Sequence, residues 1–236
     1  MIRRIAHRGY SNEAPENTLA AFELAADKGF RAVEADVAFT ADNYAVILHD
    51  DDVDRTTSGH GELAKMKLTE LLQLDAGSWK SPEYRLEHVP TFEEFIQVCA
   101  HRNLHPYIEL KNPEKLNNLQ AHSLYETVRA HGLVHNCTWI SFKVEHLERI
   151  RRIDPTARLG LLCHMIMPWT FTSVEVRLRN GKNYVFIDAE YEKIRPSAVY
   201  GCQDRDIPLE LWSTSASGDE MAAESSKYVT GFTSNC

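Results

Sequence analysis

The sequence predicts an α/β fold, a (β/α)8 TIM barrel with a small insertion after the second strand. Two observations carry this prediction. Short apolar runs rich in β-branched and aromatic residues occur eight times along the 236 residues, and segments of helical periodicity separate most of them. Strands that alternate with helices indicate βαβ units and a parallel sheet. Eight such units favour a closed barrel over an open sheet.

The predicted elements follow one another in a regular order. The strands are Ile2–His7, Ala32–Val37, Pro106–Lys111, Cys137–Phe142, Arg158–Cys163, Tyr184–Asp188, Leu209–Trp212 and Tyr228–Thr233. The helices are Asn17–Lys28, Phe92–Arg102, Leu119–Ala130, Val144–Ile153, Ser173–Leu178, Ile194–Cys202 and Ala216–Ser226. No linker or composition change divides this order, so a single domain over residues 1–236 is expected.

One apolar run breaks the alternation. Ala45–Asp50 follows the second strand with only Thr40–Tyr44 between them, which is too short for a parallel crossover. We therefore expect the return arm of a hairpin. An insertion over about residues 51–90 should follow it, with a turn at Ser58–Gly61 and a short helix near Thr69–Leu74.

Composition and charge exclude several classes of protein. Hydrophobic residues make up 43% and charged residues 25%, an ordinary globular balance. The net charge of −8 argues against nucleic-acid binding but leaves room for a small anionic substrate beside a bound cation. The five cysteines form no Cys-x-x-Cys pair, and no signal peptide or membrane span is visible. These features predict a cytoplasmic location without stable membrane insertion, and they leave a homo-oligomer open.

Three carboxylates stand out because of their spacing. Glu34 and Asp36 are two residues apart in a strand, so both point to one face, and Glu109 and Lys111 repeat this arrangement on the next barrel strand. An isolated acidic pair is more often a solvated strand face. Three carboxylates that converge inside a barrel would instead repel one another unless a cation neutralised them. Oxygen ligands suit one hard divalent cation, Mg²⁺ or Ca²⁺.

Two histidines lie where such a barrel places its chemistry. His7 ends the first strand and His49 ends the hairpin arm, and active sites of these barrels lie at the carboxyl ends of the strands. Beside a metal-bound phosphate, two histidines can serve as general acid and general base. Arg8 is suited to bidentate contact with phosphate oxygens, and Gly9 allows a sharp turn.

Together these residues form a pattern that resembles the glycerophosphodiester phosphodiesterase family. The pattern comprises His7-Arg8-Gly9, Pro15-Glu16-Asn17-Thr18, Ala21-Phe22, Glu34-Ala35-Asp36-Val37, Thr40-Ala41-Asp42, His49-Asp50, Arg55-Thr56-Thr57, Glu109-Leu110-Lys111, Ser141-Phe142, Leu211-Trp212 and Val229-Thr230-Gly231-Phe232-Thr233-Ser234-Asn235. The match is dense over the first 111 residues and sparser afterwards.

The resemblance implies a barrel enzyme of lipid and glycerol metabolism that hydrolyses glycerophosphodiesters to glycerol 3-phosphate and an alcohol. It implies metal ligands at Glu34, Asp36 and Glu109 and an acid–base pair at His7 and His49. It further implies substrate binding by the residues Arg8, Lys111, Phe142 and Trp212. The sequence departs from the family after Trp212, where Ser213-Thr214-Ser215 replaces the usual Asn, and this change concerns the substrate pocket.

Other interpretations remain open at this stage. A lysophospholipid or another phosphodiester could be the substrate, or the barrel could bind a phosphodiester without catalysis. The nucleophile could be water or a neighbouring glycerol hydroxyl. Asn17 is a good helix N-cap, and the Pro15–Thr18 motif has a structural reading as good as a functional one. Asp188 and Glu190, a second acidic pair, are expected to be solvated or salt-bridged.

Overall fold

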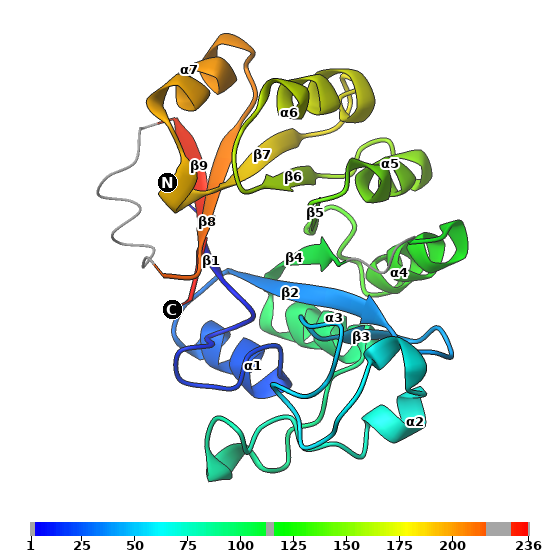
Figure 1. Cartoon of the computed structure of the whole chain (residues 1–236). Coiled ribbons are helices and arrows are strands. Elements are labelled where there is room, and N and C mark those ends of the chain that lie inside the picture. The colour runs from blue at the N-terminus through cyan, green and yellow to red at the C-terminus, as the bar shows by residue number, and fades with distance from the viewer. Residues whose placement is uncertain (1–2, 112–115, 216–227, 236) are drawn as a thin grey trace.

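Eight parallel strands form a closed barrel in the computed structural model, which describes residues 3–111, 116–215 and 228–235 (Figure 1). The strands are β1 (Arg3–Ala6), β2 (Ala32–Phe39), β4 (His105–Leu110), β5 (Thr138–Ser141), β6 (Leu159–Cys163), β7 (Val185–Glu190), β8 (Leu209–Ser213) and β9 (Val229–Ser234). Strand β1 pairs with β2 on one side and with β9 on the other, which closes the ring. The predicted barrel is thus confirmed.

Helices surround the strands on the outside of the barrel (Figure 1). They are α1 (Leu19–Asp27), α3 (Phe92–Arg102), α4 (Asn118–Ala130), α5 (Val144–Ile153), α6 (Pro168–Thr172) and α7 (Pro196–Asp204). The predicted Ser173–Leu178 segment is a π-helix that continues α6. The predicted helix Ala216–Ser226 lies outside the described residues.

The expected hairpin is present. Strand β3 (Ala45–Ile47) pairs antiparallel with the end of β2. The insertion that follows contains α2 (Leu68–Leu71) and two short 3-10 helices, Leu63–Lys65 and Pro82–Tyr84. A separate apolar cluster supports it, composed of Val46, Leu48, Val53, Leu63, Leu71, Ala76 and Val89.

Alternation along β2 decides which side chains face the barrel interior. Val33, Ala35 and Val37 pack in the outer core beneath the helices, so Glu34 and Asp36 point to the other face, inside the ring. A smaller apolar cluster fills the interior with Ile5, Ala32, Tyr107, Ile140, Leu162 and Phe186. Among the described helices, none combines the length and the apolar character needed to span a bilayer.

Candidate active site

A cavity of 390 Å³ opens at the carboxyl ends of the strands and collects the predicted site residues. Its lining consists of His7, Arg8, Glu34, His49, Glu109, Lys111, Ile140, Phe142, Leu162, His164, Asp188, Trp212, Thr214 and Thr233. Eight of the nine predicted site residues are in this set, and Asp36, the ninth, is buried behind it at 0% exposure. The strands therefore bring together residues more than 200 positions apart in the chain.

A tight turn after β1 places the first of these groups. Arg8 has φ 55° and Gly9 has φ 78°, both in the left-handed region. A Cβ on Gly9 would lie 2.6 Å from the carbonyl carbon of Ala21, so only glycine fits against α1. The turn aims the backbone N–H of Arg8 at Glu34 Oε2, to which it donates at 3.0 Å.

Three carboxylates form a compact cluster inside the barrel. Asp36 on β2 lies directly opposite Glu109 on β4, and oxygens of Glu34, Asp36 and Glu109 all lie within 4.8 Å of one another. All three side chains are buried, and Glu34 Oε1 and Asp36 Oδ1 have no hydrogen-bond partner among the described residues. Buried, unpartnered oxygens that converge in this way fit a hard divalent cation such as Mg²⁺ or Ca²⁺.

Burial and mutual repulsion act on the pKa values of the three carboxylates. Burial, and then the charges of Asp36 and Glu109, raise the pKa of Glu34 well above its ordinary value. Burial and the charge of Asp36 likewise raise the pKa of Glu109 to about 7. Burial alone would also raise the pKa of Asp36, but Arg8 and Lys111 hold it below its ordinary value. The cluster therefore resists carrying three negative charges.

Two cationic side chains flank the carboxylates. The Arg8 Nε lies 3.2 Å from Asp36 Oδ2, and the Lys111 Nζ lies 3.4 Å from Glu109 Oε1. Burial opposes the charged form of Lys111, but Glu109 and Asp36 raise its pKa above the ordinary value. Both cations line the cavity, so an anion beside the carboxylates would meet fixed positive charge.

His7 is held by the opposite end of the chain. Its Nδ1 lies 2.6 Å from Asn235 Oδ1, which directs Nε2 toward Glu34 at 3.9 Å. Burial, and then the charge of Arg8, lower the pKa of His7 to about 4, so its neutral form is favoured. Asn235 ends the last of the motifs that resemble the family, but the sequence predicted no role for this residue.

A chain of ion pairs holds His49. Its Nδ1 lies 2.5 Å from Asp50 Oδ1, and Asp50 accepts from Arg55 Nε at 2.6 Å. Arg55 then donates twice to Glu16, each time at 2.8 Å, and Glu16 accepts from Arg8 at 2.7 Å. The chain thus joins the second histidine to the residue beside the first.

The Pro15–Thr18 motif has a definite role in this geometry. Asn17 Nδ2 donates to Asp36 Oδ2 at 2.8 Å, which orients the carboxylate. The prediction that Asn17 caps the helix is wrong, because α1 is capped by Thr18, whose side chain accepts from the Ala21 N–H. Asn17 has φ 58°, and its amide is directed into the barrel instead.

Aromatic rings form the opposite wall of the cavity. Phe142 follows β5, His164 follows β6 and Trp212 lies on β8. The Phe142 ring stacks on His164 with centroids 5.0 Å apart, and both rings contact Trp212 edge-on at 6.0 and 5.5 Å. The sequence analysis predicted no role for His164. Only its place directly after a strand could have indicated one.

The second acidic pair divides between two environments. Glu190 forms ion pairs with His164 at 2.6 Å and Lys193 at 2.9 Å, as expected. The expectation for Asp188 is wrong, because this residue is 1% exposed and neither of its oxygens has a partner among the described residues. Burial, with Glu210 and Glu109 nearby, raises the pKa of Asp188 well above its ordinary value.

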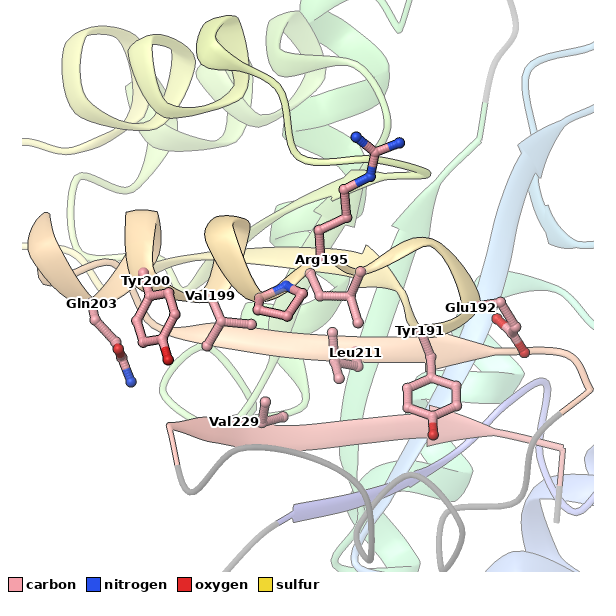
Figure 2. Close-up of a pocket in the computed structure, with 10 residues that line it drawn as sticks. Tyr191, Glu192, Arg195, Val199, Tyr200, Gln203, Leu211 and Val229 are labelled. Atoms are coloured by element: carbon pink, nitrogen blue, oxygen red, sulfur yellow. The ribbon is translucent and has the colours of Figure 1, made fainter.

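A second cavity, of 620 Å³, lies outside the barrel (Figure 2). Its walls come from α7, β8, β9 and the turn after β7, and the lining includes Tyr191, Arg195, Val199, Leu211 and Val229. None of the predicted site residues is in that lining. The barrel cavity is therefore the candidate active site.

A known protein family and several known proteins resemble this chain in sequence. The sequence profile described as the glycerophosphoryl diester phosphodiesterase family matches residues 7–197. A glycerophosphodiester phosphodiesterase from Caldanaerobacter subterraneus subsp. tengcongensis is 30% identical over 217 residues, which cover 91% of this chain and 86% of the relative. A relative from Bacillus subtilis, whose name assigns the same activity provisionally, is 48% identical over 183 residues, 78% of this chain and 74% of its own.

A solved structure shares the whole architecture. A phosphodiesterase from Oleispira antarctica, in complex with the product sn-glycerol 3-phosphate, superposes with a TM-score of 0.90 at 29% identity. The match covers 99% of this chain and 92% of that one.

Proposed function

The chain belongs to the glycerophosphoryl diester phosphodiesterase family, and from that premise we propose that it hydrolyses glycerophosphodiesters to glycerol 3-phosphate and an alcohol. The observation that carries the proposal is the convergence, at and directly behind one cavity, of two histidines, three carboxylates and two cations. The Oleispira relative with bound sn-glycerol 3-phosphate supports the choice of substrate class.

Glu34, Asp36 and Glu109 would hold one divalent cation, Mg²⁺ or Ca²⁺. When bound, such an ion polarises a phosphoryl oxygen and orients the diester. Asn17 and the Arg8 backbone N–H fix the carboxylates that would hold it. The Arg8 and Lys111 side chains bind the phosphate and oppose the negative charge that grows during the reaction.

His7 and His49 serve as the acid–base pair. One takes a proton from the nucleophile, and the other donates a proton to the leaving alkoxide. Each ring is anchored through Nδ1, His7 by Asn235 and His49 by Asp50, so that each keeps Nε2 for substrate. The neutral form favoured at His7 suits the base, which leaves the role of the acid to His49.

A product assay tests this function. Release of glycerol 3-phosphate is measured from glycerophosphocholine and glycerophosphoethanolamine, with EDTA, Mg²⁺ or Ca²⁺ added in turn. We expect release that needs a divalent cation and falls by about 10²–10⁴-fold in His7→Ala and in His49→Ala. His60→Ala is the matched control, because that side chain is 85% exposed in the insertion. Near-normal turnover in both active-site variants would refute the mechanism.

One observation favours a lysophospholipid as a second candidate substrate. A neighbouring cavity of 630 Å³ shares Phe142, Leu162 and His164 with the active-site cavity. It continues past Met165 and Trp169, which are 42% and 65% exposed, and so offers apolar surface to an acyl chain. Turnover of long-chain lysophosphatidylcholine that exceeds turnover of glycerophosphocholine and falls in Trp169→Ser would favour this substrate.

The cytoplasmic location of the protein remains a prediction. In support, Cys99, Cys137, Cys163 and Cys202 are all free thiols in the described part of the chain, three of them buried. Free thiols of this kind are usual in reducing compartments.

A further inference from the structure

The barrel wall opposite Glu34, Asp36 and Glu109 also carries polar side chains. In the ring of strands, β7 lies across from β2, and β8 and β9 follow it. These three neighbouring strands contribute Asp188, Trp212 and Thr233 to the lining of the active-site cavity. Asp188 and Thr233 are 1% and 3% exposed, and nothing in the proposed acid–base mechanism uses any of the three.

The polar atoms of these side chains are buried without a partner. Both carboxylate oxygens of Asp188, the Nε1 of Trp212 and the Oγ1 of Thr233 have no hydrogen-bond partner among the residues the structure describes. Buried polar groups in native proteins are nearly always hydrogen-bonded, because the loss of water is otherwise uncompensated. Four unpartnered atoms on three residues that line one cavity therefore indicate that a ligand supplies the missing bonds.

The types of these atoms identify the ligand. A carboxyl group accepts hydrogen bonds and also donates one when it is protonated, the form that the raised pKa of Asp188 favours. An indole N–H only donates, and a threonine hydroxyl does both. The phosphate is already placed beside Arg8 and Lys111 on the other wall, and an ammonium group would have no lone pair for the Trp212 N–H. A hydroxyl group both donates and accepts, so it can satisfy the carboxylate and the indole at once. The Phe142 and Trp212 rings add apolar surface for the attached carbons.

We propose that Asp188, Trp212 and Thr233 form a subsite that binds hydroxyl groups of the substrate, making Asp188 a specificity-determining residue. This inference rests on the proposed function for the position of the phosphate. The hydroxyls belong to the glycerol half, which every glycerophosphodiester carries, or to a polyol head group such as inositol. The chemistry of recognition is the same in both cases, and the substrates below distinguish them.

Binding without turnover tests the subsite independently of catalysis. Titration calorimetry compares sn-glycerol 3-phosphate with n-propyl phosphate, which has the same carbon chain but no hydroxyls. If the subsite holds the glycerol half, wild type should prefer the first by at least about tenfold, because hydrogen bonds to buried polar groups discriminate strongly. Asp188→Leu and Thr233→Val keep the shape of each side chain and remove its polar atoms, so both should bring the ratio toward one.

Glu210→Gln is the matched control. Glu210 is also a buried acid, next to Asp188 in register, but it does not line the cavity, and its bond from Tyr107 would survive as an amide contact. The ratio should not change in this variant. Replacing an unpaired buried carboxylate with an apolar isostere is usually tolerated by the fold. If Asp188→Leu nevertheless fails to fold, Thr233→Val alone carries the test.

Turnover of two diesters assigns the hydroxyls. If the variants lower kcat/KM on glycerophosphocholine and glycerophosphoinositol alike, and lose the binding preference, the subsite holds the glycerol half. If only glycerophosphoinositol is affected, the subsite holds the head group. The subsite is refuted if neither the binding ratio nor the ratio of the two kcat/KM values changes. If the wild-type protein hydrolyses neither diester but still prefers sn-glycerol 3-phosphate to n-propyl phosphate, the proposed function is refuted and the subsite is not.

Discussion

Replacing Glu109 by Gln gives the sharpest test of the buried carboxylate cluster. The pKa of Glu109 is about 7 in the fold, compared with an ordinary value of 4.5 for a glutamate side chain. A raised carboxyl pKa means that the folded state holds its proton to higher pH than the unfolded chain does. The contribution of Glu109 to stability is therefore complete below pH 4.5 and is lost as the pH rises through about 7. At about 1.4 kcal/mol per pKa unit, the full loss is roughly 3 kcal/mol.

Glu109→Gln removes this titration. In EDTA, the unfolding free energy of the variant minus that of wild type should increase by roughly 3 kcal/mol between pH 4.5 and pH 7.5. The contribution of His7 is common to both proteins and cancels, so the difference reports Glu109 together with Glu34, whose pKa the charge of Glu109 raises. Lys111 keeps Asp36 as a partner at 3.8 Å in the variant. For a chain of this size the effect corresponds to roughly 6–12 °C in Tm.

Denaturant unfolding at several pH values measures this difference, and a divalent cation then reverses it. At pH 8, Mg²⁺ or Ca²⁺ at about 100 times Kd should stabilise wild type by roughly 2.7 kcal/mol. The variant should gain less, since one of its three carboxylates is now a neutral amide. A free-energy difference that does not vary with pH, or equal stabilisation of both proteins by the cation, would refute the account of the cluster.

Three further predictions concern the residues that position the site. Arg55→Gln removes the link between Asp50 and Glu16 and should lower kcat by about tenfold, because His49 loses its fixed orientation; Arg129→Gln, which breaks an exposed ion pair on α4, is the steady-state control. Asn235→Ala should lower kcat to a similar extent, since His7 loses its Nδ1 partner, and an unchanged kcat would show that Asn235 does not hold that ring. Gly9→Ala should lower the unfolding free energy by about 1–3 kcal/mol more than Gly132→Ala in denaturant titrations, because both positions have positive φ but only Gly9 faces a backbone atom at 2.6 Å. Equal losses in the two glycine variants would contradict the close-contact argument.

Local signals predicted much of the fold. The helices Phe92–Arg102 and Val144–Ile153 have the predicted bounds, and the first begins with a capping box between Thr91 and Glu94. The helix after β6 was placed too late, because α6 begins at Pro168, where proline suits the first turn. The misplaced cap at Asn17 has a tertiary cause, since the bond to Asp36 overrides the local preference of that side chain.

Alternation along strands also predicted which carboxylates converge, but it could not predict their partners. The i, i+2 rule places Glu34 with Asp36, and equally Asp188 with Glu190, on one face. Whether such a pair meets cations depends on residues from other strands. Glu34 and Asp36 lie beside Arg8, whereas Asp188 lies beside Glu210 and has no cation in hydrogen-bonding reach. That contrast depends on the register between β7 and β8, which the sequence does not encode locally.

The two walls of the cavity explain why the reaction could be predicted from the sequence more easily than the substrate. The turn after β1, together with β2, the β3 arm and β4, supplies both histidines, all three carboxylates and both cations. Proton transfer and charge neutralisation require particular atoms, so this wall has a dense and specific sequence pattern. The wall from β5 to β9 supplies aromatic rings and unpartnered neutral or acidic groups, and several side chains could satisfy a hydroxyl or cover a carbon chain. Its sequence pattern is correspondingly sparse, so the head group has to be inferred from which buried polar atoms the fold leaves without a partner.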